Sequence, residues 1–81
     1  MDLEALEELI ESNVPDATAT VSHARGPGDD DHLAATVVSP AFEERSLVDQ
    51  HELVYDALGD RMTGDIHAIE LTTLTPEQAE D

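Results

Sequence analysis

The chain has 81 residues, with twenty Asp and Glu against three Arg, no Lys and no cysteine. This length predicts one domain, residues 1–81, with a modest core and little room for a deep substrate pocket. The lack of cysteine excludes disulfides, thiolate nucleophiles and Cys-ligated metal sites built by this chain alone. No apolar run reaches the roughly 18 residues of a membrane span. The N-terminus is acidic, unlike a signal peptide, so the sequence predicts a soluble, cytoplasmic protein that does not contact membranes.

The formal net charge of −17 admits two interpretations. An acidic chain with few aromatic residues can be disordered. However, 40% of the residues are hydrophobic and they recur with helix and strand periods, which favours a folded domain. The charge then indicates an extreme halophile, because molar salt shortens the Debye length to about 3 Å and screens self-repulsion. We therefore expect the fold to loosen in low salt.

The first half of the chain predicts one helix and two strands. Residues 3–13 carry leucine and isoleucine at helical spacing, and Pro15 ends this helix. Residues 17–22 alternate small apolar with hydroxyl side chains, which is typical of a strand. Residues 23–31 are rich in glycine, proline and aspartate and predict a loop. A second strand over residues 32–39 completes an antiparallel hairpin.

The second half predicts a longer helix, a strand and a final short helix. Residues 40–45 form a turn, and Ser46 begins the main helix as its N-cap. Gly64 is expected to end that helix as its C-terminal cap. Residues 65–73 alternate as a strand, and Thr75 caps the last helix. The order α-β-β-α-β-α predicts a two-layer α+β domain with a three-stranded mixed sheet, whose third strand pairs in parallel with an earlier one.

Four histidines, His23, His32, His51 and His67, are the candidate chemical groups. Histidine is the commonest metal ligand in proteins. His51 lies in the apolar stripe of the main helix, which favours a partly buried residue hydrogen-bonded to a neighbour over a ligand. His23 is at the start of the long loop, where it is either a solvated side chain or a movable metal ligand. His32, at the end of the same loop, is interpreted as a structural residue. For His67, near the start of the last strand, both interpretations stand, and no pair has the spacing of a zinc motif.

No catalytic constellation is visible. The run Asp29-Asp30-Asp31 lacks the alternating oxygen ligands and the distal glutamate of a calcium loop, so a solvated acidic loop is favoured. No phosphate-binding glycine motif, activated nucleophile or acid–base pair is present. The sequence therefore predicts a binding module with no catalytic residues, and it does not predict an enzyme.

Three motifs in fixed order link the chain to a known family. They are Val38-Ser39-x-x-Phe42, Leu47-x-x-x-His51-x-x-Val54-Tyr55-x-x-Leu58 and Ile66-His67-Ala68-Ile69. Each motif is weak alone, but the ordered set over nearly the whole chain resembles the BolA family. The resemblance implies a type II KH-like fold.

The resemblance also implies a partner and a cofactor. BolA-like domains pair with monothiol glutaredoxins and in some cases share a [2Fe–2S] cluster, whose thiolates come from the glutaredoxin and a small thiol. By position, the ligands from this chain would be His67 and His23, while His32 matches a structural histidine. The isolated chain would bind no cluster and would be a monomer or a weak homodimer. Imidazole in place of two thiolates raises the cluster's reduction potential.

Two positions depart from the family pattern. Glu44 stands where the family usually has glycine, and Gln50 stands where it usually has arginine. The alternative function is a KH-like, nucleic-acid-binding transcriptional regulator of the stress response, which needs a GxxG loop and a basic surface. The chain has neither, and only clustering of its three arginines in space would favour that role. A plain protein-interaction domain, in which the histidines only shape a surface, is the third interpretation.

Overall fold

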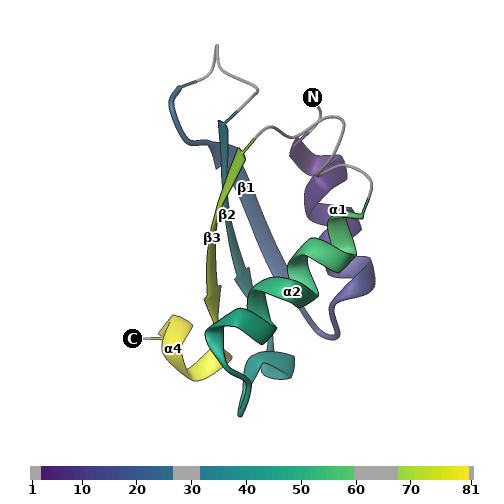
Figure 1. Cartoon of the computed structure of the whole chain (residues 1–81), viewed down its shortest axis with the longest axis vertical. Helices are drawn as coiled ribbons and strands as arrows, with labels where there is room; N and C mark the ends of the chain where they lie inside the picture. The colour runs from purple at the N-terminus through teal and green to yellow at the C-terminus, as the bar shows by residue number, and fades with distance from the viewer. Residues whose placement is uncertain (1–2, 27–31, 60–67, 81) are drawn as a thin grey trace.

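The computed structural model describes residues 3–26, 32–59 and 68–80 (Figure 1). The elements in chain order are α1 (Leu3–Asn13), β1 (Thr18–His23), β2 (His32–Val38), the 3-10 turn η1 (Pro40–Phe42), α2 (Leu47–Leu58), β3 (Ala68–Leu74) and α4 (Pro76–Glu80). The strand order is β1-β2-β3, with β1 antiparallel and β3 parallel to β2. The predicted α+β architecture with a mixed three-stranded sheet is confirmed. None of the described helices is long and apolar enough to cross a bilayer.

The helices begin where their capping residues predict. The Ser46 hydroxyl accepts the Asp49 N–H at 3.2 Å, which satisfies one of the unpaired donors at the start of α2. At α4 the cap is reciprocal: the Gln78 N–H donates to Thr75 Oγ1 at 3.3 Å, and the Thr75 N–H donates to Gln78 Oε1 at 2.9 Å. Both N-terminal caps predicted from the sequence are therefore confirmed.

The end of α2 differs from the prediction. The helix ends at Leu58, and the next residue, Gly59, caps it with a φ of 56° and donates its N–H to the Tyr55 carbonyl at 2.9 Å. Glycine adopts this left-handed φ without the Cβ clash that other residues suffer, so the first suitable glycine ends the helix. Gly64, the predicted cap, lies outside the described residues.

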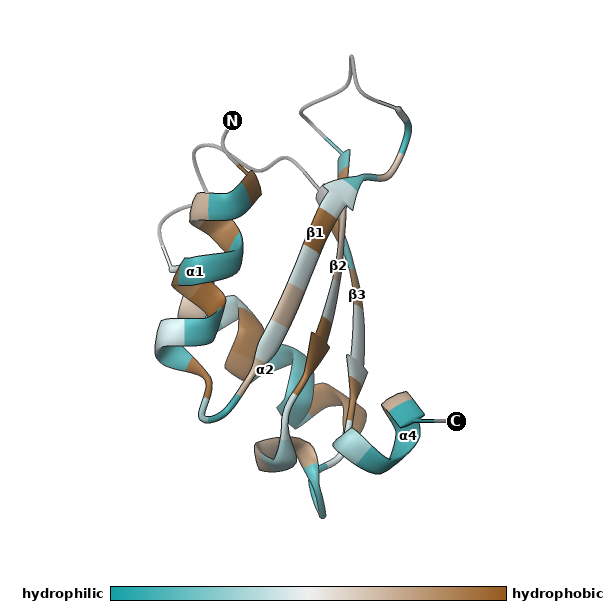
Figure 2. Cartoon of the chain, turned by 180° about the vertical axis from the view of Figure 1, so that it is seen from behind, coloured by the Kyte–Doolittle hydropathy of each residue, from teal (hydrophilic) through white to brown (hydrophobic). Residues whose placement is uncertain are grey.

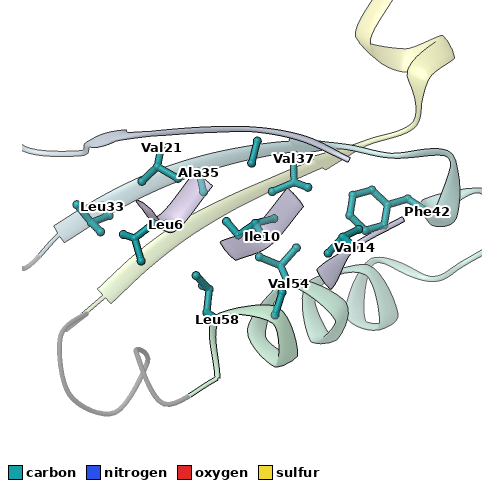
Figure 3. Close-up of a cluster of buried hydrophobic side chains, with 12 residues drawn as sticks. Leu6, Ile10, Val14, Val21, Leu33, Ala35, Val37, Phe42, Val54 and Leu58 are labelled. Carbon is teal, nitrogen blue, oxygen red and sulfur yellow. The ribbon is translucent and has the colours of Figure 1, made fainter. Parts of the chain in front are cut away.

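The core lies between the sheet and the two longer helices, which pack on one of its faces (Figures 1 and 3). Along β2, Leu33, Ala35 and Val37 are buried, while the alternate residues are more exposed. Along α1, hydrophobic residues recur at helical spacing (Figure 2), and Leu6 and Ile10 among them are buried. The remaining buried apolar side chains are Leu6, Ile10, Val14, Ala19, Val21, Phe42, Val54, Ala57 and Leu58.

The outer edge of β1 is occupied by two carboxylates from α1. Glu7 Oε2 accepts the Val21 N–H at 2.8 Å, and Glu11 Oε2 accepts the Ala19 N–H at 2.9 Å. These N–H groups point away from β2, since those of the alternate residues pair inward. An unpaired strand edge is a template for association with another chain, and here two side chains take the place of a neighbouring strand.

Replacing Glu7 and Glu11 together by alanine is expected to lower the free energy of unfolding by about 2–3 kcal/mol, because two part-buried N–H groups lose charged acceptors. Urea unfolding followed by circular dichroism measures the loss. The Glu7→Gln, Glu11→Gln double variant makes the same change in net charge but keeps an oxygen acceptor at each position, so it should lose less than half as much. Equal stability of both double variants would contradict a hydrogen-bonding role.

Candidate functional site

One end of the sheet gathers the starts and ends of all three strands. β1 ends at His23, β2 begins at His32 and β3 begins at Ala68. Because β1 is antiparallel and β3 is parallel to β2, these three residues lie at the same end (Figure 1). We call this the histidine end of the sheet. It is the candidate site because it brings together chain positions that are more than forty residues apart in the sequence.

His23 belongs to a strand and not to the loop in which the sequence analysis placed it. It pairs with Leu33 across the ladder, and the following Ala24 N–H donates to the His32 carbonyl at 2.9 Å. The side chain is half-buried, and the alternation of β1 places it on the helix-facing side with Ala19 and Val21. The backbone of His23 is thus held by the sheet. His23 is therefore anchored at a strand end and does not lie in a movable loop, and its role as a ligand stays a prediction.

His32 projects to the opposite side of the sheet. It pairs with Ala68 and is half-buried, and the residues that alternate with it, Leu33 and Ala35, form the buried face. Neighbouring strands bring the backbones of His23 and His32 close together, but their side chains leave opposite faces. These two histidines therefore do not form a ligand pair for one metal ion. This placement agrees with the structural interpretation of His32.

His67 lies outside the described residues and immediately precedes Ala68 in the sequence. Its assignment as a ligand stays a prediction. The alternation in the sequence predicts that Ile69 shares a face with His67, and in the structure Ile69 pairs with Leu33, which pairs in turn with His23. With strands about 4.8 Å apart, the backbones of His23 and Ile69 are about 10 Å apart across the sheet.

The described part of the chain does not form a complete metal site. Within residues 3–26, 32–59 and 68–80, no group of three or more His, Cys, Asp or Glu side chains could hold a metal ion. Imidazole is a suitable ligand for iron, but the sequence supplies no thiolate. The half-buried imidazole of His23 is a single candidate ligand of a kind that an iron–sulfur centre accepts. Because the chain has no cysteine, the thiolates of such a centre would have to come from another molecule.

A shallow pocket adjoins the histidine end on the other side of His32. It has a volume of about 170 Å³ and is lined by Ala24, Arg25, His32, Leu33 and Glu70. Pockets that enclose small molecules are usually about 300–1,000 Å³. This one is too small to enclose a cofactor or a typical substrate. The sequence did not reveal it, because Arg25 and Glu70 come to line one pocket only through the pairing of β1 with β2 and of β2 with β3.

His51 lies within α2 and is half-buried. Its Nε2 atom is buried and hydrogen-bonds to no described residue. The prediction that His51 belongs to the packed face of the helix is confirmed, but the hydrogen bond expected for this nitrogen is not found.

The comparisons with known proteins agree with the fold and the motifs. A family model for BolA-like proteins matches residues 4–78. The chain belongs to the BolA family. BolA-like protein 1 from Bos taurus is 39% identical over 56 residues, which are 69% of this chain but only 42% of that protein. The chain therefore spans less than half the length of this relative.

Two solved structures of BolA proteins superpose on nearly the whole chain. A BolA homologue from Coxiella burnetii matches with a TM-score of 0.84 and 33% identity, covering 100% of this chain and 99% of that one. The BolA domain of SufE1 from Arabidopsis thaliana matches with a TM-score of 0.76 and 30% identity, covering 98% and 94%. The resemblance inferred from the three motifs is thus confirmed, together with the fold that it implied.

The two departures from the BolA pattern have structural consequences at the end of the sheet opposite the histidine end. Glu44 has a φ of 65°, a left-handed conformation that is costly for a residue with a side chain and explains why glycine is usual there. Gln50 joins three segments: its Nε2 donates to the carbonyls of Phe42 at 3.1 Å and Arg45 at 3.0 Å, and its Oε1 accepts the Thr73 hydroxyl at 2.6 Å. In this BolA-family chain, Gln50 is therefore a structural residue.

The arginines do not form a basic track in the part of this BolA-family chain that the structure describes. Arg25 follows β1 at the histidine end, while Arg45 follows η1 at the other end, where its Nε donates to the Ala41 carbonyl at 2.8 Å (Figure 1). The length of β2, roughly 20 Å, separates the two ends. Arg61 lies outside the described residues. Arg25 and Arg45 are therefore not clustered in space, which is the arrangement that would favour nucleic-acid binding.

Proposed function

We propose that this BolA-family protein is an adaptor that binds a monothiol glutaredoxin and shares a labile [2Fe–2S] cluster with it, in iron–sulfur trafficking or in iron or redox sensing. His23 and His67 are the ligands from this chain in the proposal, and the glutaredoxin and a small thiol supply the thiolates. The observation that carries the proposal is the placement of His23. His23 is half-buried and lies at the end of the sheet where β3 begins. The first residue of β3, Ala68, directly follows His67 in the sequence.

The chemistry of the ligands supports a shared cluster. The chain has no cysteine, so it holds no [2Fe–2S] cluster alone. Two histidines in place of two thiolates on one iron raise the reduction potential of such a centre. The backbone of His23 is fixed by its pairing with Leu33. Binding of a cluster to its imidazole therefore loses little backbone entropy at this residue. When bound, the cluster would supply the redox chemistry, and this chain would supply two imidazoles and the docking surface.

The test is visible absorption and circular dichroism of the protein mixed with a monothiol glutaredoxin, iron, sulfide and a small thiol in molar KCl. The wild-type protein should give a spectrum that differs from that of the glutaredoxin alone. His67→Ala should abolish this spectrum and His23→Ala should weaken or abolish it. His32→Ala is the matched control, because His32 leaves the opposite face of the sheet, and it should keep the spectrum. If the wild-type protein leaves the glutaredoxin spectrum unchanged, the proposal of a shared cluster is wrong.

A second measurement separates cluster sharing from a plain interaction domain. Calorimetric titration with the cluster-free glutaredoxin reports protein binding alone. A ligand role predicts that His67→Ala leaves this affinity within about twofold of wild type while the cluster spectrum disappears. Equal loss of both signals would assign the histidine to the interaction surface.

Nucleic-acid binding is the disfavoured alternative. Neutralising phosphates requires lysine or arginine, and the chain has three arginines amid twenty carboxylates. Arg25 and Arg45 lie at opposite ends of the sheet, so they do not form one basic cluster.

The acidic surface supports a proposed adaptation to concentrated salt. Among the exposed residues of the described chain are Glu4, Glu8, Glu11, Asp16, Glu43, Glu44, Asp49, Glu52, Asp56, Glu70, Glu77 and Glu80. Few opposite charges are available to offset them, so screening by salt must do so. The salt dependence of stability tests this proposal.

A further inference from the structure

The sheet has two edge strands, β1 and β3, and the fold treats them differently. The outward N–H groups of Ala19 and Val21 on β1 are hydrogen-bonded by Glu11 and Glu7. An edge filled in this way cannot accept another strand without first losing both carboxylates. The other edge, β3, receives no comparable side-chain hydrogen bonds from the described residues: Ile69 to Thr72 are half-buried or exposed, and only Thr73, near its end, is buried at 7% exposed.

The hydrogen bonds show which groups of β3 face outward. The Ser39 N–H, at the end of β2, donates to the Leu74 carbonyl at 3.0 Å, so the peptide groups of Leu74 point toward β2. Because these directions alternate along a strand, the N–H groups of Ile69, Leu71 and Thr73 point away from the sheet. In residues 3–26, 32–59 and 68–80, no hydrogen bond reaches these three N–H groups.

The sequence of β3 suits strand addition. The strand pairs residue by residue with β2 from Ala68 to Leu74, without a bulge. It contains isoleucine, leucine and threonine but no proline or lysine, and Glu70 is its only charged residue, so it has few of the features that block an edge. Extended segments of partner proteins bind to such edges through main-chain hydrogen bonds. We propose that the edge of β3 binds an extended, basic segment of a partner protein as a fourth strand.

Charge decides the kind of occupant. A second copy of this chain would bring another net charge of −17 to the edge, and the two copies would repel each other. The exposed carboxylates next to the edge are Glu70 on the strand itself and Glu77 and Glu80 on α4, which directly follows it. A segment with lysine or arginine complements these groups, whereas an acidic segment is excluded. The inference goes beyond the proposed function, because it requires neither a cluster nor a histidine.

Amide hydrogen exchange measured by NMR tests the inference on the whole chain. The probe is a synthetic peptide of about eight residues that alternates valine and lysine. At a peptide concentration tenfold above its Kd, exchange at Ile69, Leu71 and Thr73 should slow about tenfold. Exchange at Ala19 and Val21 should not change, since that edge is already filled. Protection of alternate residues on one strand only is the signature of strand addition.

Two peptide controls and a pair of protein variants complete the experiment. A peptide that is N-methylated at two adjacent central residues cannot pair along either edge, so it should not protect the three amides. A peptide that has glutamate in place of lysine should bind far more weakly. Glu70→Lys should weaken binding of the lysine peptide about three- to fivefold. Glu52→Lys makes the same change in net charge on α2 and should have little effect.

Three outcomes would overturn the inference. Binding without protection of Ile69, Leu71 and Thr73 would show only general attraction to an acidic surface. Protection that rises with protein concentration in the absence of peptide would identify a second copy as the occupant. No binding and no protection at millimolar peptide would show that the edge of β3 does not accept a strand.

Discussion

Replacing Phe42 by alanine is expected to remove a large part of the free energy of unfolding. Phe42 is the only phenylalanine of the chain and is 1% exposed, packed among the core side chains that join η1 to the helices and the sheet (Figure 3). Removal of a buried phenylalanine side chain costs about 3–5 kcal/mol, from lost burial and from the cavity that remains. A domain of 81 residues has a total stability of about 4–12 kcal/mol. The substitution therefore removes a large part of the total free energy of unfolding.

Urea unfolding in molar KCl, followed by far-ultraviolet circular dichroism, measures this effect. With a slope of about 1 kcal/mol per molar urea, the midpoint should fall by about 3 M or more. Tyr55→Ala is the matched control, because it removes the only other aromatic side chain from a site on α2 that is 40% exposed. It should shift the midpoint by less than about a third as much. Similar shifts for both variants would show that Phe42 does not anchor the core.

The thermal stability of the protein is expected to rise steeply with salt. Between about 10 mM and 1 M KCl the Debye length falls from about 30 Å to 3 Å, so repulsion within the net charge of −17 is progressively screened. Compaction brings these charges together, and the repulsion amounts to several kcal/mol in the folded state at low salt. Since 1 kcal/mol shifts Tm by about 4–8 °C for a domain of this size, Tm should rise by at least about 20 °C.

The shape of the salt curve distinguishes screening from salting-out. Screening nearly saturates by about 1 M, whereas stronger apolar burial through excluded salts continues to grow with concentration. A variant with Glu43, Glu52 and Glu77 replaced by glutamine keeps the core but has three fewer negative charges. It should start from a higher Tm in low salt and gain less from KCl. A Tm that stays flat over the whole series would contradict both the repulsion argument and the proposed adaptation to salt.

Much of the fold follows from interactions between residues close in sequence. The spacing of Leu6 and Ile10 set the buried stripe of α1, and alternation identified β1 and β2. The caps at Ser46 and Thr75 depend on groups three residues away, so they are visible in the sequence. The ordered motifs around Phe42 and His51 also indicated the BolA family before any tertiary contact was considered.

The candidate site was only partly predictable. The sequence singled out His23 and His67, but it placed His23 in a mobile loop. The pairing of His23 with Leu33, ten residues later, extends the ladder and anchors the histidine. A strand end is set by the partner strand as much as by local composition, and no local pattern shows where pairing stops. The opposite directions of His23 and His32 likewise depend on the register between the strands.

By itself the sequence determined the order and type of the elements, the acidic surface, the absence of thiolates and the family. Only the tertiary structure decided that Gln50 bridges to Thr73, and that Glu7 and Glu11 close the edge of β1 while the edge of β3 receives no hydrogen bond from the described residues. Local patterns arise from groups within a turn or two of each other. The hydrogen bonds among these features connect residues that are from eight to 23 positions apart in the sequence, and the open edge depends on which strand has no neighbour. Only packing of the whole chain brings such groups together.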